Sequence, residues 1–179
     1  LWGMTYVEHN PDSWEGWQWG GDHMWGFSSR LGIPEQYDLL EDALKHCEMM
    51  VFWSSDPETT GGVYGAHEST PRRDWLKQLG VKMVFIDPFF NHTAALVGDK
   101  WMAPRMGTDP ALGLAIAFVW LTEDLYDKEY VATHTHGFEE WKRYVLGESD
   151  GVPKTPEWAE AETTIPARTS NRLPVSASR

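Results

Sequence analysis

Two short apolar runs, each followed by an Asp-Pro pair, constrain the fold of this 179-residue chain more than any other feature. Met49–Trp53 is followed by Asp56-Pro57, and Val81–Ile86 is followed directly by Asp87-Pro88. Short runs rich in apolar, β-branched and aromatic residues that end near proline are typical of buried strands. The segment between them, Tyr64–Leu79, has the length of a crossover helix. Strand, helix and strand in this order predict a right-handed βαβ unit with a parallel sheet.

Further apolar segments extend this pattern into an α/β domain. Tyr37–His46 has the spacing of an amphipathic helix, and Trp101–Pro104 reads as a third short strand. Asp109 is expected to cap a helix over Pro110–Val119, with Pro110 in its first position. Further helices are expected at Lys128–His134, Phe138–Leu146 and Glu157–Glu162. The predicted fold class is therefore α/β, a three-layer domain with a mostly parallel sheet and Rossmann-like βαβ units.

The two ends of the chain differ from its middle. Residues 1–34 crowd tryptophan and glycine without helix or strand periodicity, which predicts an irregular loop packed by its own aromatic side chains. Thr163–Arg179 loses apolar periodicity and is expected to be unpacked. We therefore expect a loop segment over 1–34, an α/β domain over 35–165 and an unpacked tail over 166–179. Because the chain starts at Leu1 rather than at a methionine, we expect it to be a piece of a longer protein.

Charge and cysteine content exclude several classes of function. The net charge of -12 argues against a nucleic-acid partner, because such binding depends on clustered Lys and Arg. Cys47 is the only cysteine, so the chain's own cysteines form neither an internal disulfide nor an iron–sulfur cluster. No run reaches the ~18 apolar residues of a membrane span, and no signal peptide is recognisable. We therefore expect a cytoplasmic protein without a membrane segment.

Polar residues follow both main strands and predict a ligand site. In a parallel sheet the ends of neighbouring strands lie at one edge, where open α/β sheets bind nucleotides. An acidic residue there, such as Asp87, accepts hydrogen bonds from ribose hydroxyls; the alternative is that Asp87 only caps a turn. Arg105 is the cation expected nearest to this edge. The hydroxyls and free N–H groups suited to a pyrophosphate come from Ser54, Ser55, Thr59, Thr60, Gly61, Gly62, Asn91 and Thr93.

Two other groups of residues carry possible chemistry. Asp12 and Ser13 are neighbouring oxygen donors among apolar tryptophans, and the alternative is an Asx-type turn at Asn10–Asp12. His134 and His136 bracket a threonine without further ligands nearby, which favours a surface or capping role over a metal site. Neither GxGxxG nor GxxxxGK[ST] occurs, so the common dinucleotide and P-loop fingerprints are absent from the sequence.

Taken in order, these motifs resemble a known family. They are Trp53-Ser54-Ser55-Asp56-Pro57, Ile86-Asp87-Pro88 with Thr93, Ala103-Pro104, Gly107-Thr108-Asp109, Glu123–Asp127, His136-Gly137-Phe138 and Leu146–Gly151. Over residues 1–168, the chain is similar to the nucleotide-binding third domain of the dimethyl sulfoxide reductase family of molybdopterin oxidoreductases. Within that family, Asn10–Trp14 and the tryptophan-rich loop are most similar to members that transfer a hydroxyl group between polyhydroxylated benzenes.

The resemblance implies a cofactor, bis(molybdopterin guanine dinucleotide) molybdenum, and a role for several residues. Ser13 would be the protein ligand of molybdenum, and Asp12 would act as an acid or base toward a small phenolic substrate. Asp87 and Asp109 would hold the ribose and the guanine of one dinucleotide. The remaining cofactor-binding residues implied are Trp53, Ser54, Ser55, Asp56 and Pro57 along the phosphates, together with Pro88, Thr93 and Gly107.

The family also implies partners and an activity for the parent protein. The partners are the remainder of a large subunit and an iron–sulfur small subunit, and the parent reaction is hydroxyl transfer. Two alternatives remain open at this point. One is an oxotransferase of the same family acting on a small N-oxide, S-oxide or oxyanion, and the other is a non-catalytic nucleotide-binding module. The isolated chain is expected to be inactive, because half of the cofactor cage would be missing.

Overall fold

The computed structural model describes residues 20–24, 26, 39–60 and 66–170. The chain divides into two compact units, Leu1–Glu41 and Asp42–Arg179. In the first unit, residues 20–24 form a short helix, and the Gly26 N–H donates to the Asp22 carbonyl at 2.9 Å. Asp12 and Ser13 lie outside the described residues, and the domain limits expected from the sequence stay predictions.

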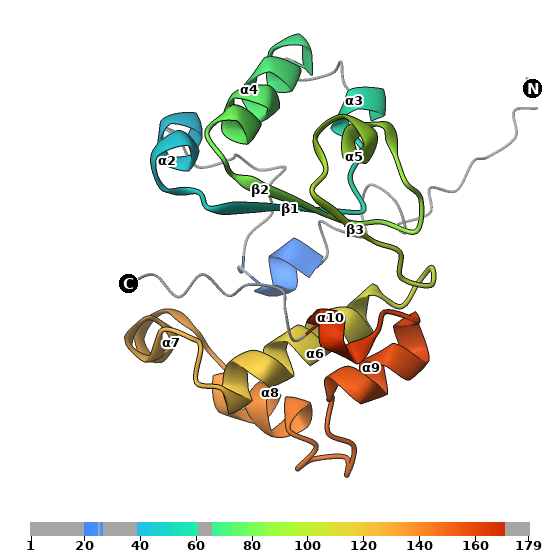
Figure 1. Ribbon diagram of the computed structural model, residues 1–179. Helices are drawn as coiled ribbons and strands as arrows, with labels where there is room; N and C mark the ends of the chain where they lie inside the picture. Colours follow the sequence, from blue (N-terminus) through green and yellow to red (C-terminus); the bar gives the residue numbers. More distant parts are fainter. Residues whose placement is uncertain (1–19, 25, 27–38, 61–65, 171–179) are drawn as a thin grey trace, which may run out of the picture. The chain divides into compact units, whose positions relative to one another are not determined.

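A three-stranded parallel sheet organises the second unit (Figure 1). Its strands are β1 (Met49–Trp53), β2 (Lys82–Ile86) and β3 (Lys100–Met102), in the order β1-β2-β3. Trp53 pairs with Ile86, which in turn pairs with Met102, so all three strands end at the same level. The parallel sheet is therefore confirmed, whereas the Rossmann-like detail and the handedness of the crossover stay predictions.

One face of the sheet is covered by α2 (Leu39–His46), α4 (Ala66–Gln78) and α5 (His92–Val97). Alternate residues of β2 point to this face, because successive side chains of a strand point to opposite sides. Met83 and Phe85 are fully buried there, and the Phe85 ring stacks on Phe52 with 4.5 Å between centroids. The helices contribute Leu76, Ala94 and Val97 to the same cluster.

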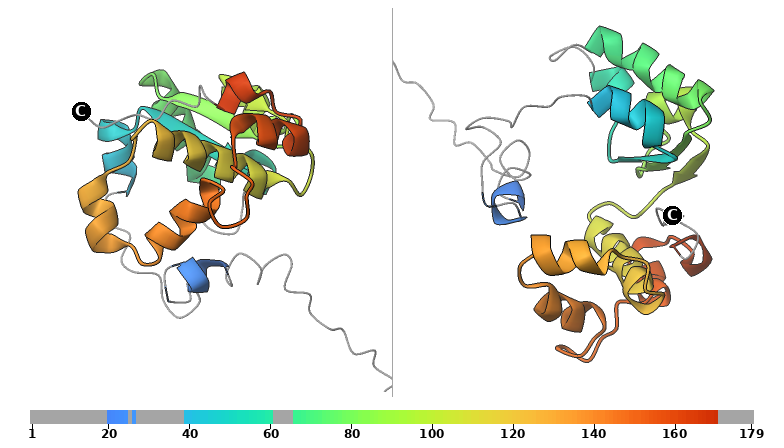
Figure 2. Two further views of the ribbon diagram at one scale, coloured as in Figure 1. Left: turned by 90° about the horizontal axis from the view of Figure 1, so that it is seen from below. Right: turned by 90° about the vertical axis from the view of Figure 1, so that its left-hand side faces the viewer.

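The other face packs against α6 (Asp109–Thr122). Val84 and Ile86 of β2 form a buried cluster with Leu112 of α6, Met102 of β3 and Ile165. The sheet thus lies between two helical layers, as Figure 2 also shows, and the predicted three-layer α/β class is confirmed.

The remaining helices are short. They are α3 (Pro57–Thr60), α7 (Lys128–His134), α8 (Phe138–Val145), α9 (Pro156–Thr163) and α10 (Ala167–Ser170). Both α8 and α9 contact α6. None of the helices in the described ranges combines the length and apolar character needed to cross a membrane.

Lys154 fixes the loop that connects α8 to α9. Its side chain is 4% exposed, and its ammonium group donates to Asp150 and to the Val152 carbonyl. The same group lies over the Tyr144 ring, 4.5 Å from its centroid. A buried lysine needs such partners because an unpaired charge inside a protein is costly. The loop is therefore tied to its own flanking helix.

Three expectations about elements are wrong in detail. Thr163 and Ile165 are buried and α10 contacts α6 and α9, so the chain stays packed beyond residue 163. The helix α5 was not expected; Asn91 caps it by accepting from the Ala94 N–H at 2.8 Å. Thr108, not Asp109, is the N-cap of α6, and Pro110 is its second residue.

Candidate functional site

The loops after β1 and β2 lie side by side at the carboxyl edge of the sheet. The Ser54 N–H donates to the Ile86 carbonyl at 2.8 Å, and the Asn91 side-chain amide donates to the Ser55 carbonyl at 3.2 Å. Ser54 adopts a positive φ of 48°, a conformation uncommon outside glycine, which turns the chain sharply at the end of β1. The predicted meeting of these two loops is confirmed.

Asp56 anchors the first loop to the second. One carboxylate oxygen accepts from the Thr93 N–H at 3.1 Å and from the Thr93 hydroxyl at 2.7 Å, and the other accepts from the Thr59 hydroxyl at 2.6 Å. Burial raises the pKa of the Asp56 carboxyl, but these hydrogen bonds outweigh it and hold the pKa well below its usual range. Both oxygens of Asp56 thus have donors within the protein, and these donors stabilise its ionised form.

Glu58 anchors the same loop to α4. Its carboxylate accepts from the Thr70 hydroxyl at 2.5 Å and from Arg73 Nε at 2.9 Å, and Arg73 is 8% exposed. Burial raises the pKa of Glu58, and the bonds from Thr70 and Arg73 lower it further than burial raises it. The Glu58 N–H also donates to the Thr93 hydroxyl at 3.1 Å. The loop after β1 is therefore held from two sides.

Asp87 caps the turn that follows β2. Its carboxylate accepts from the Phe89 N–H and from the Asn91 side-chain amide, both at 2.9 Å, and Asp87 is 9% exposed. The Trp101 indole donates to the Asp87 carbonyl at 2.8 Å. Asp87 thus caps this turn, and its expected role toward a ribose stays a prediction. Each carboxylate oxygen keeps one further lone pair.

Asp109 begins α6 and is half-buried. Its Oδ1 accepts from the Trp53 indole N–H at 2.8 Å, and no described residue donates to its Oδ2. The preceding turn is closed by the Thr108 hydroxyl, which donates to the Arg105 carbonyl at 2.6 Å, with Gly107 at a φ of +78°. An acidic side chain in the first turn of a helix interacts favourably with the helix dipole. Asp109 is thus an oriented carboxylate with one oxygen available.

Trp53 connects the segments that carry Asp87 and Asp109 at this edge. Trp53 pairs in the sheet with Ile86, the residue before Asp87, and its indole reaches Asp109. Arg105, expected as the nearest cation, is exposed. Its backbone N–H donates to the Thr163 carbonyl at 2.8 Å. The structure therefore brings together Trp53, Ser54, Ser55, Asp56, Pro57, Asp87, Pro88, Thr93, Gly107 and Asp109 around three neighbouring loops.

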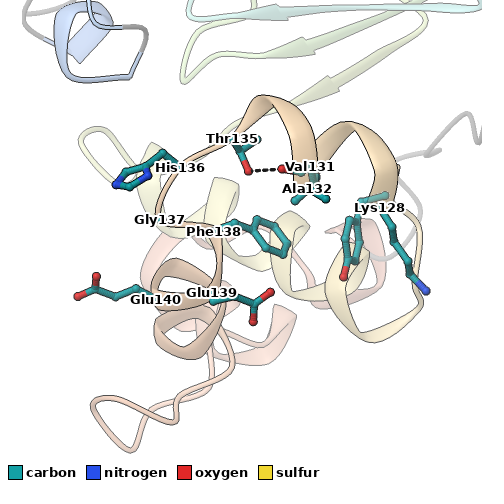
Figure 3. Close-up of a pocket in the computed structure, with 10 residues that line it drawn as sticks. Lys128, Val131, Ala132, Thr135, His136, Gly137, Phe138, Glu139 and Glu140 are labelled. Atoms are coloured by element: carbon teal, nitrogen blue, oxygen red, sulfur yellow. Dashed lines mark hydrogen bonds between the residues drawn. The ribbon is translucent and has the colours of Figure 1, made fainter.

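One hollow of the second unit lies beside this edge, and another lies away from it. An apolar groove of about 310 Å³ runs beside Trp53 between β1 and α6; Met49, Val51, Ile86, Gly113, Ile116 and Trp120 complete its lining. A second hollow of about 430 Å³ lies between α7 and α8, where Phe138 points between the helices (Figure 3). The second hollow contains none of the predicted site residues.

Several sequence expectations lie outside the described residues, among them Asp12, Ser13, Gly61 and Gly62. His134 stacks on Tyr130 with 4.3 Å between ring centroids. In the described ranges, no group of three or more His, Cys, Asp or Glu side chains is arranged to hold a metal ion.

Sequence reasoning missed the indole contacts of Trp53 and Trp101 and the ion pair of Arg73 with Glu58. The partners in these contacts lie 14 to 56 residues apart in the chain, so no local sequence motif predicts the contacts. The cap at Asn91 did carry a local signal, because Asn before a run of apolar residues is a helix start.

Comparison with known proteins shows which enzymes this chain is similar to. No protein-family model matches the chain. The chain is 70% identical over 165 residues to the pyrogallol hydroxytransferase large subunit of Pelobacter acidigallici, which covers 92% of this chain and 19% of that protein. It is 37% identical over 146 residues to the dimethyl sulfoxide/trimethylamine N-oxide reductase of Rhodobacter capsulatus, covering 80% of this chain and 18% of that protein. Over the segment that it spans, the chain is therefore similar to enzymes of the dimethyl sulfoxide reductase family of molybdopterin oxidoreductases.

A solved structure supports the fold of this family segment. Acetylene hydratase from Pelobacter acetylenicus superposes with a TM-score of 0.60 at 24% identity, covering 75% of this chain and 18% of that chain. The chain spans about a fifth of the length of the curated relatives it matches.

Proposed function

We propose that this chain binds the guanosine end of a molybdopterin guanine dinucleotide at the carboxyl edge of its sheet. The observation that carries the proposal is Asp109, an oriented carboxylate that opens α6 and keeps Oδ2 without a donor from any described residue. A carboxylate is the natural acceptor for the ring N–H and the exocyclic amine of guanine, because it accepts two hydrogen bonds in one plane.

The neighbouring loops suit the rest of a nucleotide. Asp87 would accept from ribose hydroxyls through the lone pairs that its turn leaves over. The phosphates would lie along Trp53–Pro57, where Ser54 is exposed and the chain turns sharply. The Glu58 carboxylate would repel them little, since Arg73 pairs with its charge, and the Asp56 carboxylate accepts hydrogen bonds from Thr93 and Thr59. Among the predicted contacts, Asp56 and Thr93 would therefore support the phosphate loop.

The family resemblance gives two N-terminal residues a role at the metal end of the cofactor. Ser13 would supply a hard oxygen ligand to molybdenum, and Asp12 would move protons at the phenolic substrate. When bound, the cofactor would supply the redox chemistry, while the protein orients it.

For the parent protein we propose hydroxyl transfer between polyhydroxylated benzenes, from pyrogallol to phloroglucinol. The 70% identity to the pyrogallol hydroxytransferase large subunit supports this reaction. Its partners would be the rest of a large subunit and a small subunit, since that relative is named as a large subunit. The family resemblance alone implies that the small subunit would carry iron–sulfur clusters. The similarity to dimethyl sulfoxide/trimethylamine N-oxide reductases favours a second candidate, oxygen-atom transfer with a small N-oxide or S-oxide. A panel of phenols, N-oxides and S-oxides given to the complete enzyme separates the two.

Guanosine diphosphate, which carries the base, ribose and pyrophosphate, tests the proposed site directly. The chain should bind it in isothermal titration calorimetry, and Asp109→Asn should weaken binding by about 10- to 100-fold, because a charge-assisted hydrogen bond contributes ~1.5–3 kcal/mol. Asp74→Asn, an exposed change on α4, is the matched control and should leave binding unchanged. Equal affinity of the wild-type chain and Asp109→Asn would overturn the role of Asp109.

Ser13 is tested in the complete enzyme by its metal content. Ser13→Ala should abolish turnover and leave less molybdenum bound per protein after gel filtration, measured by elemental analysis. A fully loaded and active Ser13→Ala enzyme would reject the ligand role.

A further inference from the structure

We propose that Trp53 is a positioning residue that sets base selectivity at Asp109; this inference rests on the nucleotide-binding function proposed above. The family resemblance places Trp53 along the phosphate path, whereas its indole N–H donates to Asp109 Oδ1 at 2.8 Å, across 56 residues of chain. The indole therefore bridges the end of β1 and the first turn of α6.

The contact fixes the direction in which the carboxylate faces. A short aspartate side chain at a helix start has freedom about its terminal bond, because such sp³–sp² torsions are broad. One strong donor on Oδ1 selects one orientation and leaves Oδ2 for a ligand, together with the second lone pair of Oδ1. Recognition of two adjacent N–H groups on a flat base requires that the plane of the carboxylate be fixed in this way.

The surroundings of Trp53 hold the indole in place. The ring lies against α6 at Gly113, where a β-carbon would stand 3.9 Å from it. The adjacent groove is lined by apolar side chains, including Val51, Ile116 and Trp120. Gly113 thus lies where a side chain longer than that of alanine would meet the indole.

The orientation of Asp109 should decide which base the site prefers. Guanine offers both a ring N–H and an amine to a carboxylate, hypoxanthine offers only the ring N–H, and adenine offers neither on that edge. Losing the orientation of Asp109 should therefore reduce the preference for guanine over the other two bases. Affinity arising from ribose and phosphates should change little, because those groups meet other residues.

The experiment compares guanosine, inosine and adenosine diphosphates by isothermal titration calorimetry on the full chain. Trp53→Phe keeps an aromatic ring but loses the donor, and it should reduce the ratio of guanosine to adenosine diphosphate affinity by about tenfold. Trp120→Phe changes the other tryptophan of the same groove and should leave that ratio unchanged.

A second pair of variants leaves Trp53 in place. Gly113→Val adds methyl groups that displace the indole and should reduce the same ratio, whereas Gly113→Ala places only a β-carbon at an ordinary contact distance and should not. If guanosine and adenosine diphosphate affinities fall equally in Trp53→Phe and Gly113→Val, the residue is merely structural and the inference fails. If the wild-type chain binds none of the three diphosphates, the proposed function itself fails.

Discussion

At the scale of single residues, three aspartates at one sheet edge do different work. Asp56 and Asp87 direct their oxygens to donors of the protein, whereas no donor from the described part of the chain reaches Oδ2 of Asp109. The sequence predicts all three at the site because each follows a strand or opens a helix. It does not separate their roles, since the donors are Thr93, Asn91 and Trp53 on other elements.

Asp56→Asn tests the anchoring role through pH. The pKa of Asp56 is lower in the folded chain than in the unfolded chain. The stability that the Asp56 carboxylate gives to the fold is therefore fully present above the unfolded pKa of about 4. It is lost as the pH falls through the folded pKa. At pH 7 the variant should lose about 2 kcal/mol of unfolding free energy. The difference from wild type should shrink below pH about 4. Urea titrations at pH 7, 4 and 3 measure it, and an undiminished difference at pH 3 would contradict the assignment.

At the scale of elements, long or strongly patterned segments were predictable and short ones were not. Met49–Trp53 and Lys128–His134 form the expected strand and helix without shift. The four-residue α10 has no periodicity to read, and Ile165 is buried by tertiary packing. Burial of that kind depends on what the chain meets in three dimensions.

The loop between α8 and α9 depends on the lack of a side chain at Gly147. This residue has a φ of +81°, and a β-carbon there would lie 2.3 Å from the Pro153 nitrogen. Gly151 has a similar φ of +77° but has no atom within 4 Å of a β-carbon. Gly147→Ala should therefore lower the unfolding free energy by about 3 kcal/mol or more, and Gly151→Ala by only about 1–2 kcal/mol. Thermal unfolding followed by circular dichroism compares the two variants. Equal losses of unfolding free energy would show that the loop moves to accommodate the β-carbon at residue 147.

At the scale of the whole second unit, β2 joins two apolar clusters. Its odd-numbered residues Met83 and Phe85 face one helical layer, and Val84 and Ile86 face the other. A nearly continuous apolar run predicts a strand that is covered on both faces. The sequence did not show that Ile165, near the end of the described residues, covers the second face.

Ile165→Ala tests this closure. Removing a buried isoleucine side chain should cost about 2–4 kcal/mol, because a cavity opens against Val84 and Leu112. Unfolding in urea should remain a single transition by both tryptophan fluorescence and circular dichroism, shifted to a lower midpoint. A loss below about 0.5 kcal/mol would mean that the segment is unpacked, as the sequence indicated.

Because the side chain of Lys154 is buried, tryptic cleavage after this residue can measure the unfolded population of the chain. Trypsin must bind an extended, accessible lysine, and loops are where proteases usually cut. The 4% exposure of this side chain protects the peptide bond after Lys154 while α8 and α9 hold the loop between them. Cleavage at that bond, read by mass spectrometry, should therefore appear only as the folded population is lost.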